Sequence, residues 1–344
     1  MNRKVTIIGA GSVGASIAYT AVVKGVASEI VLIDINKDKT LGEAMDIRQG
    51  IPFCTPCDIY AGDYADAVGS DIVVITSGIP RKPGQSRIDL TQTNVNIIKD
   101  IAQKIVPYAK DALYVIVSNP VDIMTYVFTK VSGIPEERVI GSGTLLDTSR
   151  LRSSLADHLA VSQKSIHAYV LGEHGDSSFV PWSIAQVGCV NLLDYKNKFS
   201  CKDQKDFDFD KQEIETYMKK SGGTIIQRKG ATFYAIAISV CHLLECIFSQ
   251  SNTSMTVSSM MHGEYGIEDV CLSIPFIVGP DGICGKILPD LTEEEIAKLH
   301  NSANMLKSVI AQIEIWFNLT LILIVGNKIK MANIFDWFNI EKAG

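Results

Sequence analysis

The sequence predicts an α/β protein whose first half forms a doubly wound parallel sheet. Short apolar runs rich in β-branched residues alternate with helical patterns there, which is typical of βαβ units. Each run is closed or followed by Gly, Asp, Asn or Ser, where the chain must turn and polar groups can face a ligand. The expected strands are residues 4–8, 29–34, 71–76 and 114–118, and the expected helix between the first two is residues 12–23.

The second half of the sequence is less regular. Residues 196–220 are rich in Asp and Lys, and the apolar run 231–248 predicts a packed helix. Residues 257–261 and 271–278, followed by the turn sequence Gly279-Pro280-Asp281-Gly282, suggest antiparallel strands. We place a domain boundary near residue 141, which divides the chain into residues 1–141, 142–311 and an atypical extension, 312–344.

The composition limits the function classes. A net charge of −6 and a pI near 5.6, with no Lys- or Arg-rich block, argue against a nucleic-acid partner. Eight cysteines in 344 residues do not resemble a disulfide framework. Cys54 and Cys57 have redox or zinc spacing, but without a second pair we expect free thiols and no metal. The first residues enter a strand pattern at once, so we expect no signal peptide, no membrane partner and a cytoplasmic protein.

A glycine-rich turn directly follows the first predicted strand. Gly9, Gly11 and Gly14 fit the G-x-G-x-x-G pattern of Rossmann domains, in which a diphosphate approaches a helix N-terminus. Asp34 closes the second strand 20 residues after Gly14, where its carboxylate can accept hydrogen bonds from ribose hydroxyls. Because that carboxylate would repel a 2′-phosphate, the sequence predicts NAD rather than NADP. The alternative is an ordinary βα turn.

Three further segments carry candidate catalytic groups, each with a structural alternative. His174 lies in a glycine-flanked turn and could be an ordinary structural histidine. Asp147 and Arg150 are three residues apart, which puts both on one helix face, but such a pair could be a simple intrahelical ion pair. Residues 78–87 form a polar loop punctuated by Gly and Pro, which could be a solvated surface loop.

Together these segments resemble the lactate/malate dehydrogenase family. The similarity runs from residue 1 to about 311 and is closest to its bacterial L-lactate branch; the matching segments are GAGSVGASIAY, GIPRKPGQSR, VSNPVD, GTLLDTSRLR and GEHGDSS. The resemblance implies a Rossmann domain followed by a mixed α/β substrate-binding domain. It also implies that the protein assembles as a homotetramer. It also implies NAD-dependent hydride transfer at C2 of a small L-2-hydroxy acid.

The resemblance assigns roles to individual residues. His174 would donate a proton to the substrate oxygen, and Asp147 would orient its ring. Arg150 would bind the substrate carboxylate through two parallel hydrogen bonds, and Arg87 would polarise the ketone. Asn119 and Thr232 would complete the substrate pocket. The implied cofactor contacts are Gly9, Gly11, Val13, Gly14, Asp34, Lys39, Tyr64, Gly78, Ile79, Val117, Asn119 and Ser142.

Two interpretations of the substrate side chain are possible, that of lactate enzymes and that of malate enzymes. Arg81 occupies the loop position that is commonly Gln in lactate enzymes and Arg in malate enzymes, and an Arg would pair with the second carboxylate of oxaloacetate. Thr232 and the sequences GTLLDTSRLR and GEHGDSS instead resemble the lactate branch. We favour L-lactate dehydrogenase, with malate dehydrogenase or a dual-specificity enzyme as the alternative.

Two further features lie outside the catalytic segments. Arg152 and His167 fall where allosteric relatives bind fructose 1,6-bisphosphate between subunits, although they could be an ordinary interface pair. The apolar run 315–325 could be an additional docking helix or a product of a non-native reading frame. Rival functions are a nucleotide sensor that has lost catalysis and a scaffold that assembles through its tail.

Overall fold

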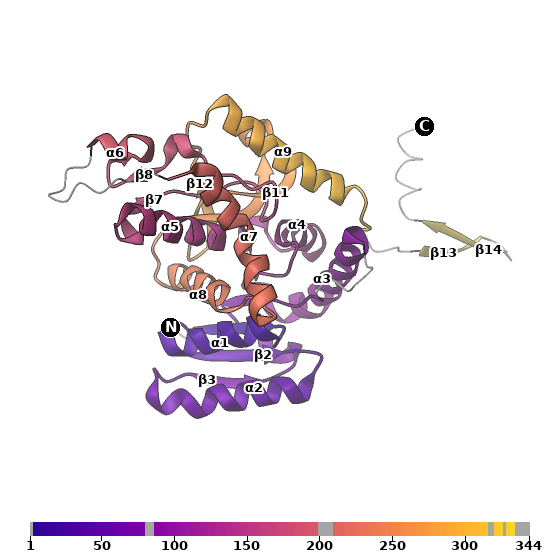
Figure 1. Cartoon of the computed structure of the whole chain (residues 1–344). Helices are drawn as coiled ribbons and strands as arrows, with labels where there is room; N and C mark the ends of the chain where they lie inside the picture. The colour runs from indigo at the N-terminus through magenta and orange to yellow at the C-terminus, as the bar shows by residue number, and fades with distance from the viewer. Residues whose placement is uncertain (1–2, 80–85, 199–208, 316–319, 326–327, 334–344) are drawn as a thin grey trace.

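The fold described here comes from a computed structural model. It describes residues 3–79, 86–198, 209–315, 320–325 and 328–333 (Figure 1). Arg81 therefore lies outside the described residues, and for Arg87 only the backbone is described.

A parallel sheet forms the first half of the chain, as the sequence predicts. Its six strands lie in the order β6-β5-β4-β1-β2-β3 within the described residues. These strands are β1 (Lys4–Ile8), β2 (Glu29–Ile33), β3 (Asp58–Ala61), β4 (Ile72–Ile75), β5 (Leu113–Ile116) and β6 (Val139–Gly141). Side chains of the central strands are buried on both faces, which explains why their sequences are continuous apolar runs. The four strands predicted from sequence are confirmed to within two residues at each end.

Helices connect and cover these strands. They are α1 (Ser12–Lys24), α2 (Lys37–Gly50), α3 (Arg87–Ala109) and α4 (Val121–Ser132). Helix α1 contacts α2 and the later helix α8 (Tyr234–Phe248), whereas α3 contacts α4. The predicted helix 12–23 is confirmed, and the predicted helix 231–248 is confirmed with a start three residues later. The doubly wound Rossmann arrangement is thereby confirmed.

The antiparallel strands of the second half extend the same sheet. Strand β10 (Thr253–His262) lies beside β6, with Ser258 opposite Gly141. Strands β11 (Glu268–Gly279) and β12 (Gly282–Lys286) follow in antiparallel pairing, which confirms the prediction for this region. A separate small sheet contains β7 (Ile166–His167), β8 (Gln186–Val187) and β9 (Val190–Asn191).

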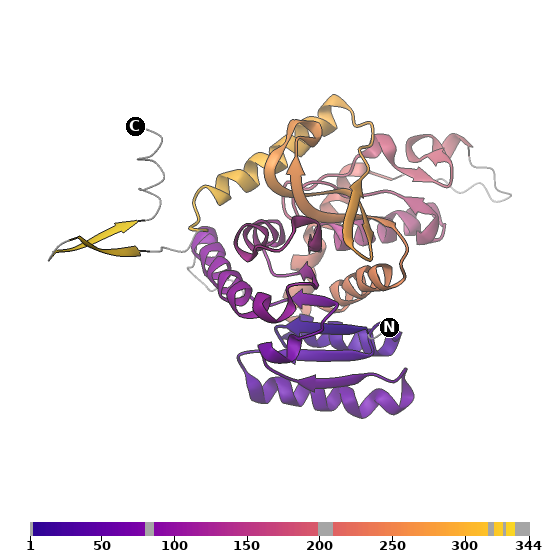
Figure 2. The ribbon, with the colours of Figure 1, turned by 180° about the vertical axis from the view of Figure 1, so that it is seen from behind.

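Four more helices pack around these strands on the side away from α2 (Figures 1 and 2). They are α5 (Leu145–Leu159), α6 (Tyr195–Lys198), α7 (Lys211–Lys229) and α9 (Glu293–Ile310). Short 3₁₀ helices occupy Ile51–Phe53, Tyr64–Ala67, Glu136–Arg138, Gln163–Ser165, Trp182–Ile184, Leu192–Asp194 and Glu264–Gly266. Among the described residues, no helix has the length and apolar character needed to cross a membrane.

The C-terminal extension corrects one expectation. One of the two alternatives for the apolar run was a docking helix, but Thr320–Val325 forms strand β13, which pairs antiparallel with β14 (Lys328–Asn333). Thr, Ile and Val in this run favour extended backbone because they are branched at Cβ. The docking-helix alternative was therefore wrong for residues 320–325.

Candidate active site

The glycines of the turn between β1 and α1 allow neighbouring atoms to pack closely against the backbone. Gly9 has φ +106°, and a Cβ there would lie 2.6 Å from Thr76 Oγ1. A Cβ on Gly14 would lie 1.8 Å from the carbonyl oxygen of Gly9, so α1 can only pack this tightly on the turn with glycine. Gly11, the N-cap of α1, has nothing within 4 Å of its Cβ position and no side chain caps the helix there. The open helix N-terminus suits a diphosphate.

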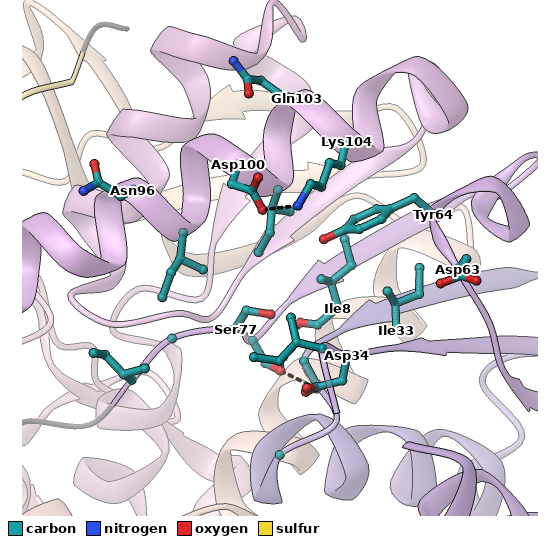
Figure 3. A pocket seen from close by; sticks show the side chains of 18 of the residues that line it. Ile8, Ile33, Asp34, Asp63, Tyr64, Ser77, Asn96, Asp100, Gln103 and Lys104 are labelled. Carbon is teal, nitrogen blue, oxygen red and sulfur yellow. Dashed lines mark hydrogen bonds and ion pairs between the residues drawn. The ribbon is translucent and has the colours of Figure 1, made fainter. Parts of the chain in front are cut away.

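Asp34 stands beside this turn at the end of β2. Its carboxylate accepts hydrogen bonds from the backbone N–H of Ala10 at 2.6 Å and of Asn36 at 3.0 Å. These bonds hold the carboxylate at the wall of a cavity of about 1110 Å³ (Figure 3). A cavity of this size is larger than a drug-sized ligand needs and suits a dinucleotide. The residues present therefore fit NAD.

The cavity contains half of the predicted cofactor set. Its lining includes Gly9, Gly11, Asp34, Tyr64, Gly78 and Ile79. The remaining predicted residues do not line it: Val13, Gly14, Lys39, Val117, Asn119 and Ser142. Lys39 is exposed on α2, whereas Lys37 lines the cavity and forms an ion pair with Asp63.

Helix α3 forms one wall of the cavity, which the sequence analysis did not predict. Thr93, Asn96, Asp100, Lys104 and Pro107 of this helix line the cavity. Their spacing of three or four residues marks one helix face, which was the available signal. Figure 3 shows Asn96, Asp100 and Lys104 on the helix that borders the cavity, across from Asp34.

Three predicted catalytic residues form a continuous hydrogen-bonded chain. The Nδ1 atom of His174 lies 2.5 Å from Oδ2 of Asp147. The other oxygen of that carboxylate accepts from Nη1 of Arg150 at 3.0 Å. Asp147 and Arg150 lie on one face of α5, as their spacing predicts, and their side chains are only 8% and 13% exposed. His174 is more accessible, at 27%, so its ring can meet a ligand.

A second carboxylate, Asp122, holds the His174 loop. Its Oδ2 accepts from the backbone N–H of His174 at 2.8 Å, and its Oδ1 accepts from Ser258 Oγ at 2.6 Å. Asp122 is the second residue of α4 and is buried, although its side chain is acidic. The sequence analysis did not predict this residue. The signal that could have identified it is a lone acidic residue in an otherwise apolar helix start.

Burial and neighbouring charges shift the pKa values of His174, Asp147 and Asp122. Burial alone would lower the pKa of His174, but the negative charge and hydrogen bond of Asp147 outweigh it and raise the pKa to about 9. Burial opposes ionisation of Asp147, yet His174 and Arg150 hold its pKa below the usual value. Burial raises the pKa of Asp122 to about 6 despite its hydrogen bonds from Ser258 and His174.

The remaining predicted substrate residues lie on other segments or outside the described residues. Thr232 is half-buried in the segment just before α8. The carbonyl oxygen of Asn119 accepts from Asn94 Nδ2 at 2.9 Å, directly before Pro120 and α4. Arg87 begins α3, so the predicted loop leads into the helix that lines the cofactor cavity.

The predicted regulatory pair lies near α5. Arg152 Nε donates to the carbonyl oxygen of Ala168 at 3.0 Å, and its guanidinium stacks over Tyr169 at 4.9 Å from the ring centre. His167, which precedes Ala168, is exposed on β7. Arg152 also lines a cavity of about 290 Å³, whereas His167 does not.

Comparison with protein families gives two consecutive matches. A family described as lactate/malate dehydrogenase, NAD binding domain, matches residues 3–141. A second, described as lactate/malate dehydrogenase, alpha/beta C-terminal domain, matches residues 144–315. The two matches meet at the end of β6.

Known proteins match over most of the chain. An L-lactate dehydrogenase of Thermoanaerobacter sp. (strain X514) is 46% identical over 313 residues, which cover 91% of this chain and 100% of that protein. One from Acetivibrio thermocellus is 45% identical over 314 residues, covering 91% and 98%. The structure of a minor L-lactate dehydrogenase from Enterococcus mundtii has a TM-score of 0.86 at 38% identity, covering 90% of this chain and 98% of that one.

Proposed function

The chain belongs to the lactate/malate dehydrogenase family, and we propose that it is an NAD-dependent L-lactate dehydrogenase that interconverts pyruvate and L-lactate. The observation that carries this proposal is the chain from His174 through Asp147 to Arg150, which offers a proton donor and a carboxylate-binding group within one connected cluster. The names of the similar proteins favour pyruvate as the substrate.

His174 is the proposed proton donor for pyruvate reduction. Its pKa of about 9 keeps the ring protonated at neutral pH, so it can protonate the developing alkoxide at C2. The bond from Nδ1 to Asp147 leaves Nε2 as the nitrogen that faces the substrate. When bound, NADH supplies the hydride that C2 receives.

Arginines and neighbouring polar groups would hold the substrate. Arg150 binds the carboxylate, because a planar guanidinium forms two parallel hydrogen bonds that a lysine cannot form. Arg87 would polarise the ketone, Asn119 would contact the nicotinamide ribose and the substrate oxygen, and Thr232 would line the far wall of the pocket. These assignments rest on the family resemblance; helix α8, which follows Thr232, also contacts α5, the helix of Asp147 and Arg150.

NAD would occupy the large cavity. Gly9, Gly11 and Gly14 would admit the diphosphate, and Asp34 would bind the adenosine ribose. We retain Val13, Tyr64, Gly78, Ile79, Val117 and Ser142 as proposed contacts along the dinucleotide. For the cationic contact, Lys37 is better supported than Lys39, because Lys37 lines the cavity.

Assembly, regulation and location extend the proposal. We propose a cytoplasmic homotetramer that binds fructose 1,6-bisphosphate through Arg152 and His167 of adjoining subunits. The hydrogen bond from Arg152 Nε to the carbonyl oxygen of Ala168, the residue after His167, supports the proposal that the two cationic side chains lie near each other. Seven described cysteines are free thiols, as expected in a reducing compartment. A lowered KM for pyruvate on adding the bisphosphate, lost in Arg152→Gln, is the expected result.

The chain division and the substrate complete the proposal. We propose that residues 1–141 form the cofactor domain, 142–311 the substrate domain and 312–344 an extension, since β6 ends at Gly141. Initial rates with NADH should be measured side by side on pyruvate and oxaloacetate, and the reverse reaction on L- and D-lactate. Turnover of pyruvate and of L-lactate supports the proposal. Oxaloacetate as the only substrate would make it a malate dehydrogenase, the alternative suggested by Arg81, which the similar proteins do not favour.

A further inference from the structure

The cofactor cavity carries more carboxylates than cations. Among the described residues that line it, the carboxylates are Asp34, Asp63 and Asp100, and the cations are Lys37 and Lys104. Three carboxylates against two ammonium groups leave one negative charge in excess. The lining as a whole therefore disfavours a cofactor that carries additional negative charge.

Both of these cations are already paired with carboxylates of the same cavity. Lys104 Nζ lies 2.7 Å from a carboxylate oxygen of Asp100, one turn earlier on α3 (Figure 3). Lys37 forms an ion pair with Asp63 and also donates to the carbonyl oxygen of Gly62 at 3.4 Å. Neither ammonium group is therefore free to bind an anionic group of the cofactor while its pair is formed.

Lys37 lies near the place where NADP differs from NAD. NADP carries a phosphate on the 2′ oxygen of the ribose that Asp34 is proposed to bind. Lys37 is the first residue of α2, and Asn36 before it donates its backbone N–H to Asp34 at 3.0 Å. The N-terminus of a helix attracts anions as well. A released Lys37 ammonium would therefore bind a 2′-phosphate at this helix start.

Asp63 is fixed where it meets Lys37. It is the N-cap of the 3₁₀ helix Tyr64–Ala67, and its side chain accepts from the backbone N–H of Asp66. In return, the Asp66 carboxylate accepts from the backbone N–H of Asp63 at 2.7 Å. The ion pair thus joins the start of α2 to the segment after β3, and the capping bonds hold its acidic member in place.

We propose that Asp63 is a second determinant of the preference for NADH over NADPH, because it neutralises Lys37 and keeps this ammonium group from binding a 2′-phosphate. Asp34 repels the phosphate directly, whereas Asp63 acts through Lys37 and is a positioning residue. The inference rests on the NAD site of the proposed function. The side chains of Lys37 and Asp63 are 56% and 75% exposed, so solvent weakens their pairing and the effect should be smaller than that of Asp34.

Asp63→Asn tests this role, because it removes the charge and keeps an oxygen that can cap the 3₁₀ helix. Fluorescence titration without substrate gives the dissociation constants of NADH and NADPH, and their ratio measures the preference. Asp63→Asn should narrow the preference for NADH by about fivefold or more, and added salt should reduce this change. Asp63→Ser, which also supplies a capping oxygen, should behave in the same way.

Two further variants separate the release of Lys37 from a change in net charge. Asp100→Asn removes one carboxylate from the same cavity and releases Lys104, on the wall across from Asp34 (Figure 3). It should narrow the preference by less than about twofold, because the released cation is not at the start of α2. Adding Lys37→Gln to Asp63→Asn removes the released ammonium and should restore the original preference. Thermal unfolding checks that each variant is folded.

The possible results distinguish the inference from the proposed function. An equal change in Asp63→Asn and Asp100→Asn would assign the effect to net charge, and a change that persists without Lys37 would assign it to another group. Either result, or no change in Asp63→Asn and Asp63→Ser, refutes the inference and leaves the proposed function standing. Failure of the unmodified enzyme to bind NADH refutes both.

Discussion

The backbone N–H of His174 donates to the buried carboxylate of Asp122 at 2.8 Å, so a second negative charge lies beside the proposed proton donor. Asp147 holds the ring of His174, whereas Asp122 holds its backbone and, through Ser258, ties the loop to β10. The loop is thereby fixed from two elements that are far apart in the sequence. The charge of Asp122 also contributes to the raised pKa of His174.

Replacing Asp122 by Asn should change the pH profile of pyruvate reduction. Reduction needs protonated His174, so kcat/KM falls as the pH rises through the pKa of His174. Removing the charge of Asp122 lowers that pKa. The alkaline limb of the profile should therefore move to lower pH in Asp122→Asn.

Ser258→Ala is the control for this prediction. It removes one hydrogen bond to Asp122 and keeps the charge, so its alkaline limb should stay near that of the unmodified enzyme. An unchanged limb in Asp122→Asn would mean that Asp122 acts only through loop geometry.

Replacing His174 by Asn should separate chemistry from cofactor binding. Loss of a general acid typically costs about two to four orders of magnitude in turnover. NADH binding, followed by its fluorescence, should stay near normal, because His174 does not line the cofactor cavity. Near-normal turnover would show that another group supplies the proton.

The pair of His174 and Asp147 should make stability depend on pH. The ordinary pKa of a histidine is 6.5, and that of His174 in the folded protein is about 9. The stabilisation from this pair is thus fully present below pH 6.5 and is lost as the pH rises to about 9, with at most about 3 kcal/mol at stake. Chemical denaturation between pH 6 and pH 9.5 measures it.

Asp147→Asn gives the matched comparison. Without the carboxylate, the main cause of the raised His174 pKa is gone, so unfolding free energy should fall much less over the same range. An equally steep fall in this variant would assign the pH dependence to other groups.

Local and distant relationships explain what the sequence could predict. Gly9, Gly14 and Asp34 follow a short pattern around one βα unit, and Asp147 and Arg150 share a helix face. Spacing alone was therefore enough to predict that the members of each set lie close together. The contact between His174 and Asp147 joins residues 27 apart, and only the family resemblance implied it.

The features that were missed depend on tertiary structure. Ser258 reaches Asp122 across 136 residues, because β10 continues the sheet beside β6. No local pattern encodes which strand lies beside which. The docking-helix alternative for the tail failed for a different reason, since an apolar run of that length suits a helix or a strand equally well.

Cofactor choice should depend on the charge of Asp34. Asp34→Asn removes the charge and retains an oxygen that can accept from the backbone N–H of Ala10. It should narrow the preference for NADH over NADPH by about tenfold or more, because the repulsion of the 2′-phosphate is lost. Asp34→Ala should narrow the preference as well, and should also destabilise the turn by about 1–3 kcal/mol, since two N–H groups lose their acceptor.

Equal use of both cofactors by the unmodified enzyme would contradict this role. The comparison needs kcat/KM for NADH and NADPH with each variant at saturating pyruvate.

Arg81 should set the balance between pyruvate and oxaloacetate. It lies outside the described residues, so the argument rests on its position in the loop that precedes α3. With oxaloacetate, Arg81 gains a carboxylate partner in a closed site, whereas with pyruvate the same charge has no partner and closing the loop over it is costly. Arg81→Gln should therefore raise kcat/KM for pyruvate and lower it for oxaloacetate, shifting the ratio by about two orders of magnitude.

Arg81→Lys is the control for charge without the planar guanidinium, and it should shift the ratio less than Arg81→Gln does. Suppose that the unmodified enzyme already prefers pyruvate strongly and that Arg81→Gln changes little. The side chain of Arg81 would then not contact the substrate, and selection against oxaloacetate would have to come from the fixed walls around Arg150 and Thr232.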